Sequence, residues 1–254
     1  MTGRMTLSQL GYVNKAFWRN PPRAFFTFVF PLMFLVIFTS LLGNDTVHLR
    51  GMTVKLSTYY VPAMGTFGVI SACYNNIAMS LAFQRDAGVL KRVNGTPLPA
   101  SAFLAAQVLH AMLVGLLLLV LTATFGRYVY DAHTPTGSAL VDCVVLLLLG
   151  GAAFCALGLA ATALIPNADA APAVVNASIL PLLFLSGIFI PFTDNTPSWI
   201  LWVARIFPIK HFAAGMQAAF IGTSFRWSDV LVVAAWGIGG LVLAVRFFTW
   251  EPRT

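Results

Sequence analysis

The sequence has few charged residues, and that scarcity points to its structural class. Charged side chains make up 9% of the 254 residues, whereas hydrophobic residues make up 59%. Soluble domains carry about 25% charged residues, so the composition predicts a membrane protein that crosses the bilayer several times. The net charge is +7, from 15 Lys and Arg against 8 Asp and Glu. In an apolar chain this excess fits cytoplasmic flanks and anionic lipid, and it gives no support to nucleic-acid binding.

Residue patterns that several kinds of catalysis require are also missing. The sequence has no G-x-x-x-x-G-K-[ST] pattern, and no glycine is followed by lysine, so the chain has no phosphate loop with which to hydrolyse ATP. The four histidines are scattered and no H-E-x-x-H pattern occurs, which gives no basis for a metal site or for catalysis within the membrane. The three cysteines fall in apolar runs and predict packing residues. We expect no catalytic residue, metal or cofactor in this chain.

Long runs without charge predict an all-α protein with six membrane spans in a single domain. The longest runs, 59–83 and 101–125, have about 25 residues each; at about 1.5 Å per residue, either can cross a hydrocarbon core of about 30 Å. The predicted spans are 24–42, 59–83, 101–125, 143–165, 170–190 and 230–248.

Two further segments are apolar but are not predicted to span. Residues 5–20 carry Leu7, Leu10, Val13 and Phe17 at helical spacing, which predicts an amphipathic helix in the membrane interface. Residues 191–229 contain apolar stretches that are too short to span, with prolines between them. These stretches predict short re-entrant or interfacial helices on the external side.

Six spans place both termini on one face of the membrane. If that face is cytoplasmic, nine Lys and Arg lie inside and six outside, as the positive-inside rule prefers. The segment 84–100 is then a cytoplasmic loop whose charged residues are Arg85, Asp86, Lys91 and Arg92. Two interpretations are open. Either the basic residues do no more than fix the topology, as basic residues in short loops do, or a short helix in the loop docks on a cytoplasmic partner.

Polar side chains at mid-span positions are the candidates for a substrate path. Tyr74, Asn75 and Asn76 lie in the middle of the second predicted span, where lipid offers no hydrogen bonds. They can line a path or join helices. His110 in the third span can titrate or contact a substrate, or it can form a quiet hydrogen bond to a neighbouring helix. Asn176 and Ser178 are the corresponding polar residues of the fifth span.

Two motifs resemble the permease subunit of ABC-2-type exporters, the group that includes daunorubicin-resistance-type drug exporters and nodulation-type lipo-oligosaccharide exporters. In the loop, Asp86, Gly88, Leu90, Arg92 and Thr96-Pro97-Leu98 are similar to the family's acidic-x-Gly pattern followed by Thr-Pro. Further on, Ser186-Gly187-Ile188-Phe189-Ile190-Pro191, with Pro197, Phe207-Pro208 and His211, resembles the family's SGIFxP region. The sequence departs from the family pattern at Val89, Gln84 and Gln217.

The resemblance implies a type V exporter fold and a role for each group of residues. It implies that residues 84–94 form a coupling helix on a separate ATP-binding subunit, beside a connecting helix at residues 7–19. The residues it assigns to coupling are Gln84, Arg85, Asp86, Gly88, Leu90, Lys91 and Arg92. Those it assigns to the substrate path are Asn75, Asn76, Asn176 and Ser178; Tyr74 and His110 complete the predicted path as candidates from their mid-span positions alone. Those it assigns to an external lid are Ser186, Gly187, Pro191 and Pro208.

The implied assembly has two permease copies and ATP-binding subunits, which would hold the ATP and Mg²⁺, in a bacterial plasma membrane with both termini cytoplasmic. The cargo would be an amphipathic drug-like compound or lipid. Two other functions remain open from the residues alone. A membrane scaffold or immunity protein would bind a partner without transport, and a proton-coupled carrier would lose its flux in the His110→Ala variant.

Overall fold

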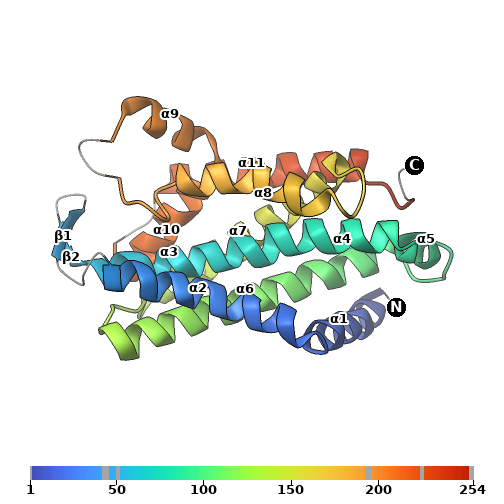
Figure 1. Cartoon of the computed structure of the whole chain (residues 1–254), viewed down its shortest axis with the longest axis horizontal. Helices are drawn as coiled ribbons and strands as arrows, with labels where there is room; N and C mark the ends of the chain where they lie inside the picture. Colours follow the sequence, from blue (N-terminus) through green and yellow to red (C-terminus); the bar gives the residue numbers. More distant parts are fainter. Residues whose placement is uncertain (1, 42–45, 50–51, 193–195, 224–225, 252–254) are drawn as a thin grey trace.

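The computed structural model describes residues 2–41, 46–49, 52–192, 196–223 and 226–251, with backbone only for 46–49 and 52–54. The described chain is a bundle of helices that run along one long axis (Figure 1). One end of the bundle, the termini end, holds α1 (Thr2–Trp18) and the short helix α5 (Val89–Asn94). The opposite end, the hairpin end, holds a small antiparallel hairpin of β1 (Thr46–Leu49) and β2 (Met52–Lys55). Apart from this hairpin, the described elements are all helical, so the all-α fold class predicted from the sequence is confirmed.

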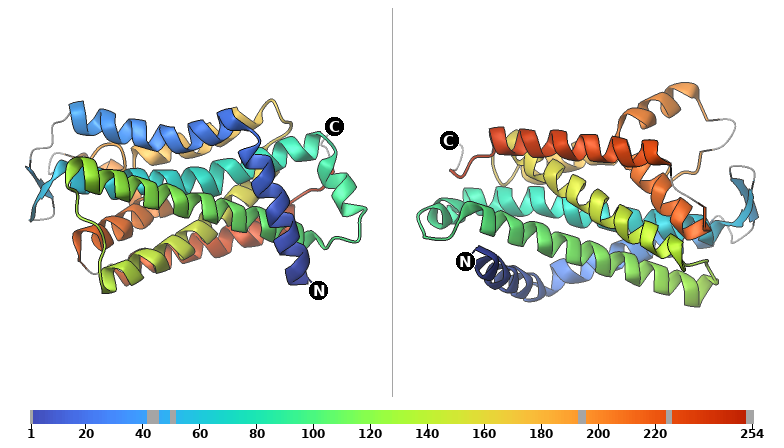
Figure 2. Two further views of the ribbon diagram at one scale, coloured as in Figure 1. Left: turned by 90° about the horizontal axis from the view of Figure 1, so that it is seen from below. Right: turned by 180° about the vertical axis from the view of Figure 1, so that it is seen from behind.

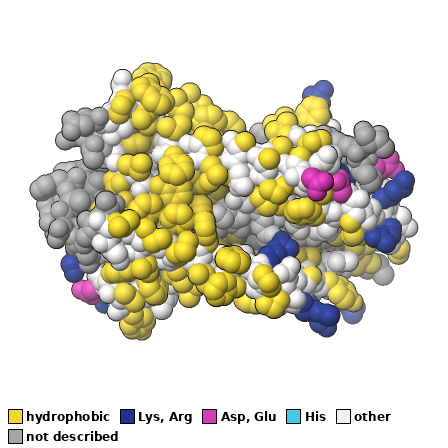
Figure 3. Space-filling view, in the orientation of Figure 1, with side chains coloured by type: hydrophobic (Ala, Val, Ile, Leu, Met, Phe, Trp, Pro, Cys, Tyr) yellow, Lys and Arg dark blue, Asp and Glu magenta, His cyan; other side chains and the backbone are white. Residues whose placement is uncertain are grey.

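Four of the helices among the described residues are long and apolar enough to cross a membrane, by length and composition. They are α2 (Pro21–Leu41), α6 (Ala100–Tyr130), α7 (Ser138–Ala161, continued by the 3₁₀ turn η2 at Thr162–Leu164) and α11 (Trp227–Phe247). They agree within a few residues with the predicted spans 24–42, 101–125, 143–165 and 230–248, although residue 42 lies outside the described part. In Figure 3, hydrophobic side chains cover most of the middle of the face shown, whereas the charged side chains lie mainly toward the termini end, with a few at the hairpin end.

The second predicted span forms one helical rod with an interruption in its middle. The rod comprises α3 (Leu56–Ile70), the π-helical turn η1 (Ser71–Asn75) and α4 (Asn76–Asp86). Every residue of α3 is buried, because the rod is the centre of the bundle: α2 and α6 pack on α3, and α7 packs on η1. A π-turn inserts an extra residue into the helical ladder and is common at functional sites. It coincides here with the Tyr74-Asn75-Asn76 cluster.

The fifth predicted span, 170–190, is shorter than expected. Helix α8 (Ala171–Phe184) has 14 residues, which corresponds to about 21 Å at the helical rise. The chain then turns through Gly187, whose φ of +83° is the left-handed conformation that favours glycine. Beyond this turn, α9 (Ser198–Ile206) projects from the bundle, and α10 (Pro208–Ile221) packs against α3, α7 and α11 (Figure 1).

Helix α1 lies across the termini end and packs on α6 (Figure 2). Its buried residue is Phe17, and Leu7 and Tyr12 are exposed. This placement fits an amphipathic helix in the interface, with Trp18 half-exposed at its end.

Gly158 of α7 lies directly against the backbone of η1. A Cβ at this position would lie 2.8 Å from the carbonyl oxygen of Tyr74 in η1, closer than side-chain carbons approach a backbone. We therefore expect Gly158→Ala to force α7 and η1 apart and to cost about 1–3 kcal/mol of stability. The measurement is the thermal unfolding midpoint of the purified chain in detergent. Gly239→Ala in α11 is the matched control, because no atom lies within 4 Å of its added carbon. Equal midpoints for the two variants would contradict the close contact.

Candidate functional site

The predicted coupling segment consists of the end of α4, a tight turn and α5. Helix α4 ends at Asp86, and Gly88 adopts a φ of +67°. A side chain at Gly88 would meet no atom within 4 Å, so its backbone conformation is the reason for glycine there. The turn lets α5 fold back on the bundle, where Leu90 is fully buried. Lys91 and Arg92 are exposed on α5, and Lys91 forms an ion pair with Glu251 at 3.7 Å.

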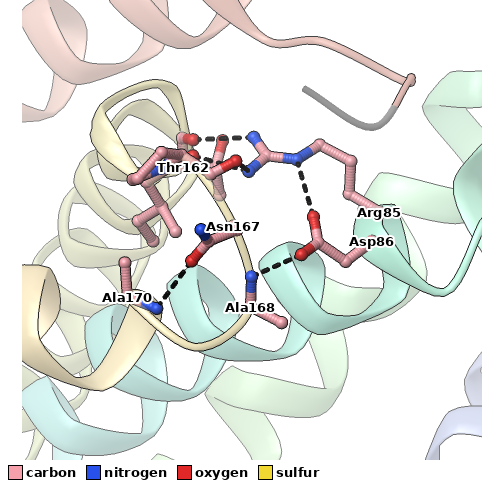
Figure 4. Close-up of polar contacts among 8 residues, drawn as sticks. Arg85, Asp86, Thr162, Asn167, Ala168 and Ala170 are labelled. Atoms are coloured by element: carbon pink, nitrogen blue, oxygen red, sulfur yellow. Dashed lines mark hydrogen bonds and ion pairs between the residues drawn. The ribbon is translucent and has the colours of Figure 1, made fainter. Parts of the chain in front are cut away.

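Arg85 fastens this segment to the connection between α7 and α8. Its guanidinium donates hydrogen bonds to the carbonyl oxygens of Thr162 at 3.0 Å and Ile165 at 2.5 Å, and a longer one to Pro166 at 3.3 Å (Figure 4). The side chain is only 2% exposed. A buried arginine is stable only when hydrogen-bonded, and these carbonyl oxygens at and after the end of η2 supply its acceptors.

Asp86 completes the same junction from the neighbouring position. Its carboxylate accepts a hydrogen bond from the backbone N–H of Ala168 at 2.5 Å, and its other oxygen lies 4.0 Å from Arg85 Nε. Asn167 closes the turn by accepting the N–H of Ala170 at 2.9 Å. We call Arg85, Asp86 and the 162–168 backbone the brace. Two of the predicted coupling residues, Arg85 and Leu90, are therefore buried. Their side chains position α5 and are not accessible to a partner.

Three of the six residues predicted for the substrate path meet in one groove. Asn75, Asn76 and Asn176 line a cavity of about 700 Å³. In Figure 1, α8 and α2 lie on opposite sides of the α3–α4 rod, and the lining residues come from these elements. Arg23 of α2 also lines the groove and donates a hydrogen bond to the Asn76 side-chain oxygen. From the sequence alone, Arg23 is simply one of the nine Lys and Arg expected on the inner face.

The other three path residues lie elsewhere. Tyr74 and Ser178 share a hydrogen bond of 2.7 Å and line a separate, mainly apolar cavity of about 480 Å³ with residues of α7 and α11. Their pairing shows that these two polar groups join the rod to α8. His110 lies in a third cavity, beneath α1, and its ring packs edge-on against Phe17 with centroids 5.1 Å apart.

The segment predicted as an external lid is bound tightly to the bundle at the hairpin end. The Tyr59 hydroxyl donates to the Gly187 carbonyl oxygen, and the Tyr60 hydroxyl donates to that of Phe189 at 3.1 Å. The Phe189 ring packs against rings of α2, α3 and α8. Ser186 and Pro208 are buried, and Pro191 is half-buried. Residues 193–195 lie outside the described part, so these contacts concern the lid segment before and after them.

His211 ties α9, α10 and α11 together at the same end. Its Nδ1 lies 2.5 Å from the Asp229 carboxylate, and its Nε2 lies 2.9 Å from the Arg205 carbonyl oxygen. The hydrogen bond to Asp229 is the main cause that raises the pKa of His211. Burial opposes it, the Arg205 carbonyl and the Asp229 charge support it, and Lys210 opposes it more weakly. The protonated ring can donate from both nitrogens.

This contact predicts how stability depends on pH. Because the pKa of His211 is raised on folding, its stabilising contribution is fully present below the unfolded value of about 6.5 and is lost as pH rises through the folded value. We expect the unfolding midpoint to fall on going from pH 6 upward, and Asp229→Asn to cost about 1.5–3 kcal/mol at pH 6. Thermal unfolding of the wild type, Asp229→Asn and His211→Phe over this range is the measurement. A pH profile that persists unchanged in His211→Phe would assign the effect to another group.

The chain is similar over most of its length to one protein family and to several transport permeases. The family model described as "ABC-2 type transporter" matches residues 10–221. The chain is 22% identical to the putative transport permease YvfS of Bacillus subtilis, over 86% of both chains. It is 24% identical to the daunorubicin resistance ABC transporter permease protein DrrB1 of Streptomyces coeruleorubidus, over 90% of this chain and 79% of the relative. It is also 24% identical to the inner membrane transport permease YadH of Escherichia coli K12, over 85% and 80% of the two chains.

Proposed function

Because this chain belongs to the ABC-2 type transporter family, we propose that it is the permease subunit of an exporter driven by a separate ATP-binding subunit. The relatives named as transport permeases support this role. We propose that it moves an amphipathic drug-like compound or lipid outward across a bacterial plasma membrane. The relative named for daunorubicin resistance supports efflux of such compounds.

The proposed topology has six spans with the termini end in the cytoplasm. In addition to the four long apolar helices, the α3–α4 rod and α8 would cross the bilayer, and α9 and α10 would form the external re-entrant region. The proposed working unit contains a second permease copy. Large apolar side chains that are exposed on α2, such as Phe25, Phe26 and Phe30, support contact with lipid or with that copy.

The observation that best supports a role in coupling is the way α5 is held. Leu90 buries one face of α5 in the bundle, and the brace fixes the end of α4 just before α5. Lys91 and Arg92 stay exposed at the termini end. A structure that served only to fix topology would need the basic charges but not the anchoring. The short helix is therefore suited to receive a partner surface and to move only together with the elements behind it.

The same contacts define a mechanical path to the groove. The brace fixes the end of α4 to the connection that leads into α8. Helix α4 and the preceding π-turn carry Asn76 and Asn75, and α8 carries Asn176. Displacement of α5 by an ATP-binding subunit would then move two walls of the groove together against α2. Such a movement of packed helices is a known form of switching between two states.

Co-purification tests this proposal. The tagged chain would be co-expressed with the products of the flanking reading frames, and any complex with an ATP-binding subunit would be assayed for ATP hydrolysis with and without amphipathic compounds. We expect the two chains to co-purify and hydrolysis to rise with substrate. A folded chain that purifies alone, together with no ATP-dependent flux, would favour a scaffold or immunity protein.

A further inference from the structure

Two cavities of the proposed permease share a common boundary at the termini end. The groove of about 700 Å³ lies between α2, the α3–α4 rod and α8. A second cavity of about 470 Å³ lies beneath α1 and is lined by α1, α4, α5 and α6; we call it the vestibule. Four residues line both spaces: Arg23, Asn76, Ser80 and Phe83. The hydrogen bond between Arg23 and Asn76 is thus located where one space meets the other.

Arg23 is the one fully charged side chain among the described residues that line either cavity. The ion pairs found in the described part of the chain do not include it. Its contacts are the neutral Asn76 side chain and the face of the Phe17 ring, with its Cζ 5.7 Å from the ring centroid. The guanidinium has five donors and Arg23 is exposed, so most of its donors are open to solvent or to a ligand that enters the cavities.

His110 provides an independent sign that the vestibule receives a polar ligand. It is 3% exposed and lines the vestibule. Neither ring nitrogen has a hydrogen-bond partner among the described residues. Buried polar groups are nearly always paired, because an unpaired one is costly. A ligand with acceptor oxygens would satisfy the imidazole.

The vestibule also has an apolar wall suited to a hydrocarbon chain, beside the polar side chains of Gln9, Gln84 and Gln107. Its walls include Val13, Phe17, Val93 and Phe103, and it opens beneath an amphipathic helix placed at the level of the lipid headgroups. A ligand that fits both features has an acidic, oxygen-rich head and an apolar tail.

We propose that the vestibule and Arg23 admit an anionic amphiphile, such as a phosphate ester with an alkyl tail, from the inner leaflet, and pass its head group to the groove at the Arg23–Asn76 contact. This inference rests on the proposed export function and specifies the substrate class. The head group would replace Asn76 on the guanidinium, because charge-assisted pairs with phosphate are stronger than a neutral amide contact. A cationic amphiphile would meet a like charge at the same point and would be excluded.

The test measures equilibrium binding of radiolabelled probes with identical tails to the full chain in a neutral detergent. The probes are dodecyl phosphate, dodecylphosphocholine and dodecyltrimethylammonium, with inorganic phosphate as a competitor. The variants are Arg23→Gln, Arg23→Lys and His110→Phe. Arg246→Gln is the matched control, because it removes the same charge from the exposed end of α11 at the same membrane face.

We expect Arg23→Gln to weaken dodecyl phosphate binding about tenfold or more, Arg23→Lys to retain most of it, and His110→Phe to weaken it severalfold. Arg246→Gln should bind dodecyl phosphate as the wild type does. The affinity for dodecyltrimethylammonium should not fall in Arg23→Gln. Equal losses in Arg23→Gln and Arg246→Gln, or preferred binding of the cationic probe, would overturn the proposal. Effective competition by inorganic phosphate would indicate a free-anion site and would also overturn it.

The outcome is separable from that of the proposed function. If the chain co-purifies with an ATP-binding subunit and transports, but binding does not depend on Arg23, only the substrate class is wrong. If Arg23-dependent binding is found without any ATP-dependent flux, the site stands as a binding site for anionic amphiphiles and the export function falls.

Discussion

Replacing Arg85 with alanine is expected to produce the largest loss of stability among the single substitutions considered. The change removes hydrogen bonds to the carbonyl oxygens of Thr162, Ile165 and Pro166 in a site where the arginine is 2% exposed. Hydrogen bonds from charged groups contribute about 1.5–3 kcal/mol each, and the loss of one partner of a buried charged cluster costs about 3–5 kcal/mol. We expect a loss of about 3 kcal/mol or more, measured as a lower thermal unfolding midpoint in detergent.

Arg92→Ala is the matched control for Arg85→Ala. Arg92 belongs to the same segment, is exposed, and donates a long hydrogen bond of 3.3 Å to the Ala87 carbonyl oxygen. Its substitution should change stability by less than about 0.5 kcal/mol. Arg85→Lys should recover only part of the loss, because an ammonium cannot reproduce the planar fork of the guanidinium. Equal stability of the Arg85→Ala and Arg92→Ala variants would contradict the brace.

Reversing both exposed charges of α5, in the double variant Lys91→Glu and Arg92→Glu, is expected to reduce substrate-stimulated ATP hydrolysis more than tenfold. Placing like charges across an interface costs several kcal/mol, and a subunit that docks on a basic helix would meet such a repulsion. Folding should be unaffected, because both side chains are exposed. The measurement combines co-purification of the ATP-binding subunit with the hydrolysis rate of the complex.

Two controls separate docking from other effects of charge. Arg246→Glu places a new negative charge at the termini end but on α11 and not on α5, and it should leave hydrolysis intact. Lys91→Ala removes the ion pair with Glu251, whose two side chains are 66% and 74% exposed, and one docking charge, but it introduces no repulsion, so its effect should be much smaller than that of the double reversal. If the double reversal co-purifies and hydrolyses like the wild type, α5 is not the docking element.

The long spans could be predicted because their signal is local. Helices α2, α6, α7 and α11 coincide with runs that lack charge, and such runs form helices wherever they cross lipid. The interruption of the rod at Ser71–Asn75 could not be predicted, because a π-turn depends on the packing of η1 against Gly158 of α7. Helix α8 ends early because the chain turns at Gly187. Hydropathy alone places this glycine inside the apolar run 170–190. The β-branched residues Val47, Thr53 and Val54 favour the strands of the hairpin, but a hydropathy pattern does not detect strands this short.

The site was predictable where a residue's role follows from its neighbours in sequence, and it was missed where partners are distant. The exposed Lys91 and Arg92 could be placed in a docking loop. Arg85 looked equivalent to them in the sequence, but its acceptors lie 77 to 81 positions further along the chain. Asn75, Asn76 and Asn176, which the family resemblance assigned to the substrate path, line one groove; their contact with a substrate stays a prediction. The importance of Arg23 emerges only from the cavities that it shares, because in sequence it belongs to an ordinary basic flank.

The most direct test of the central claim is transport by the purified complex of this chain and its ATP-binding subunit in sealed vesicles. An amphiphile supplied on the side of the ATP-binding subunit should move to the opposite leaflet or compartment when ATP is added. It should not move with a non-hydrolysable analogue or with the double charge reversal in α5. Equal movement in the presence and absence of ATP hydrolysis, with a folded complex, would contradict an ATP-driven exporter.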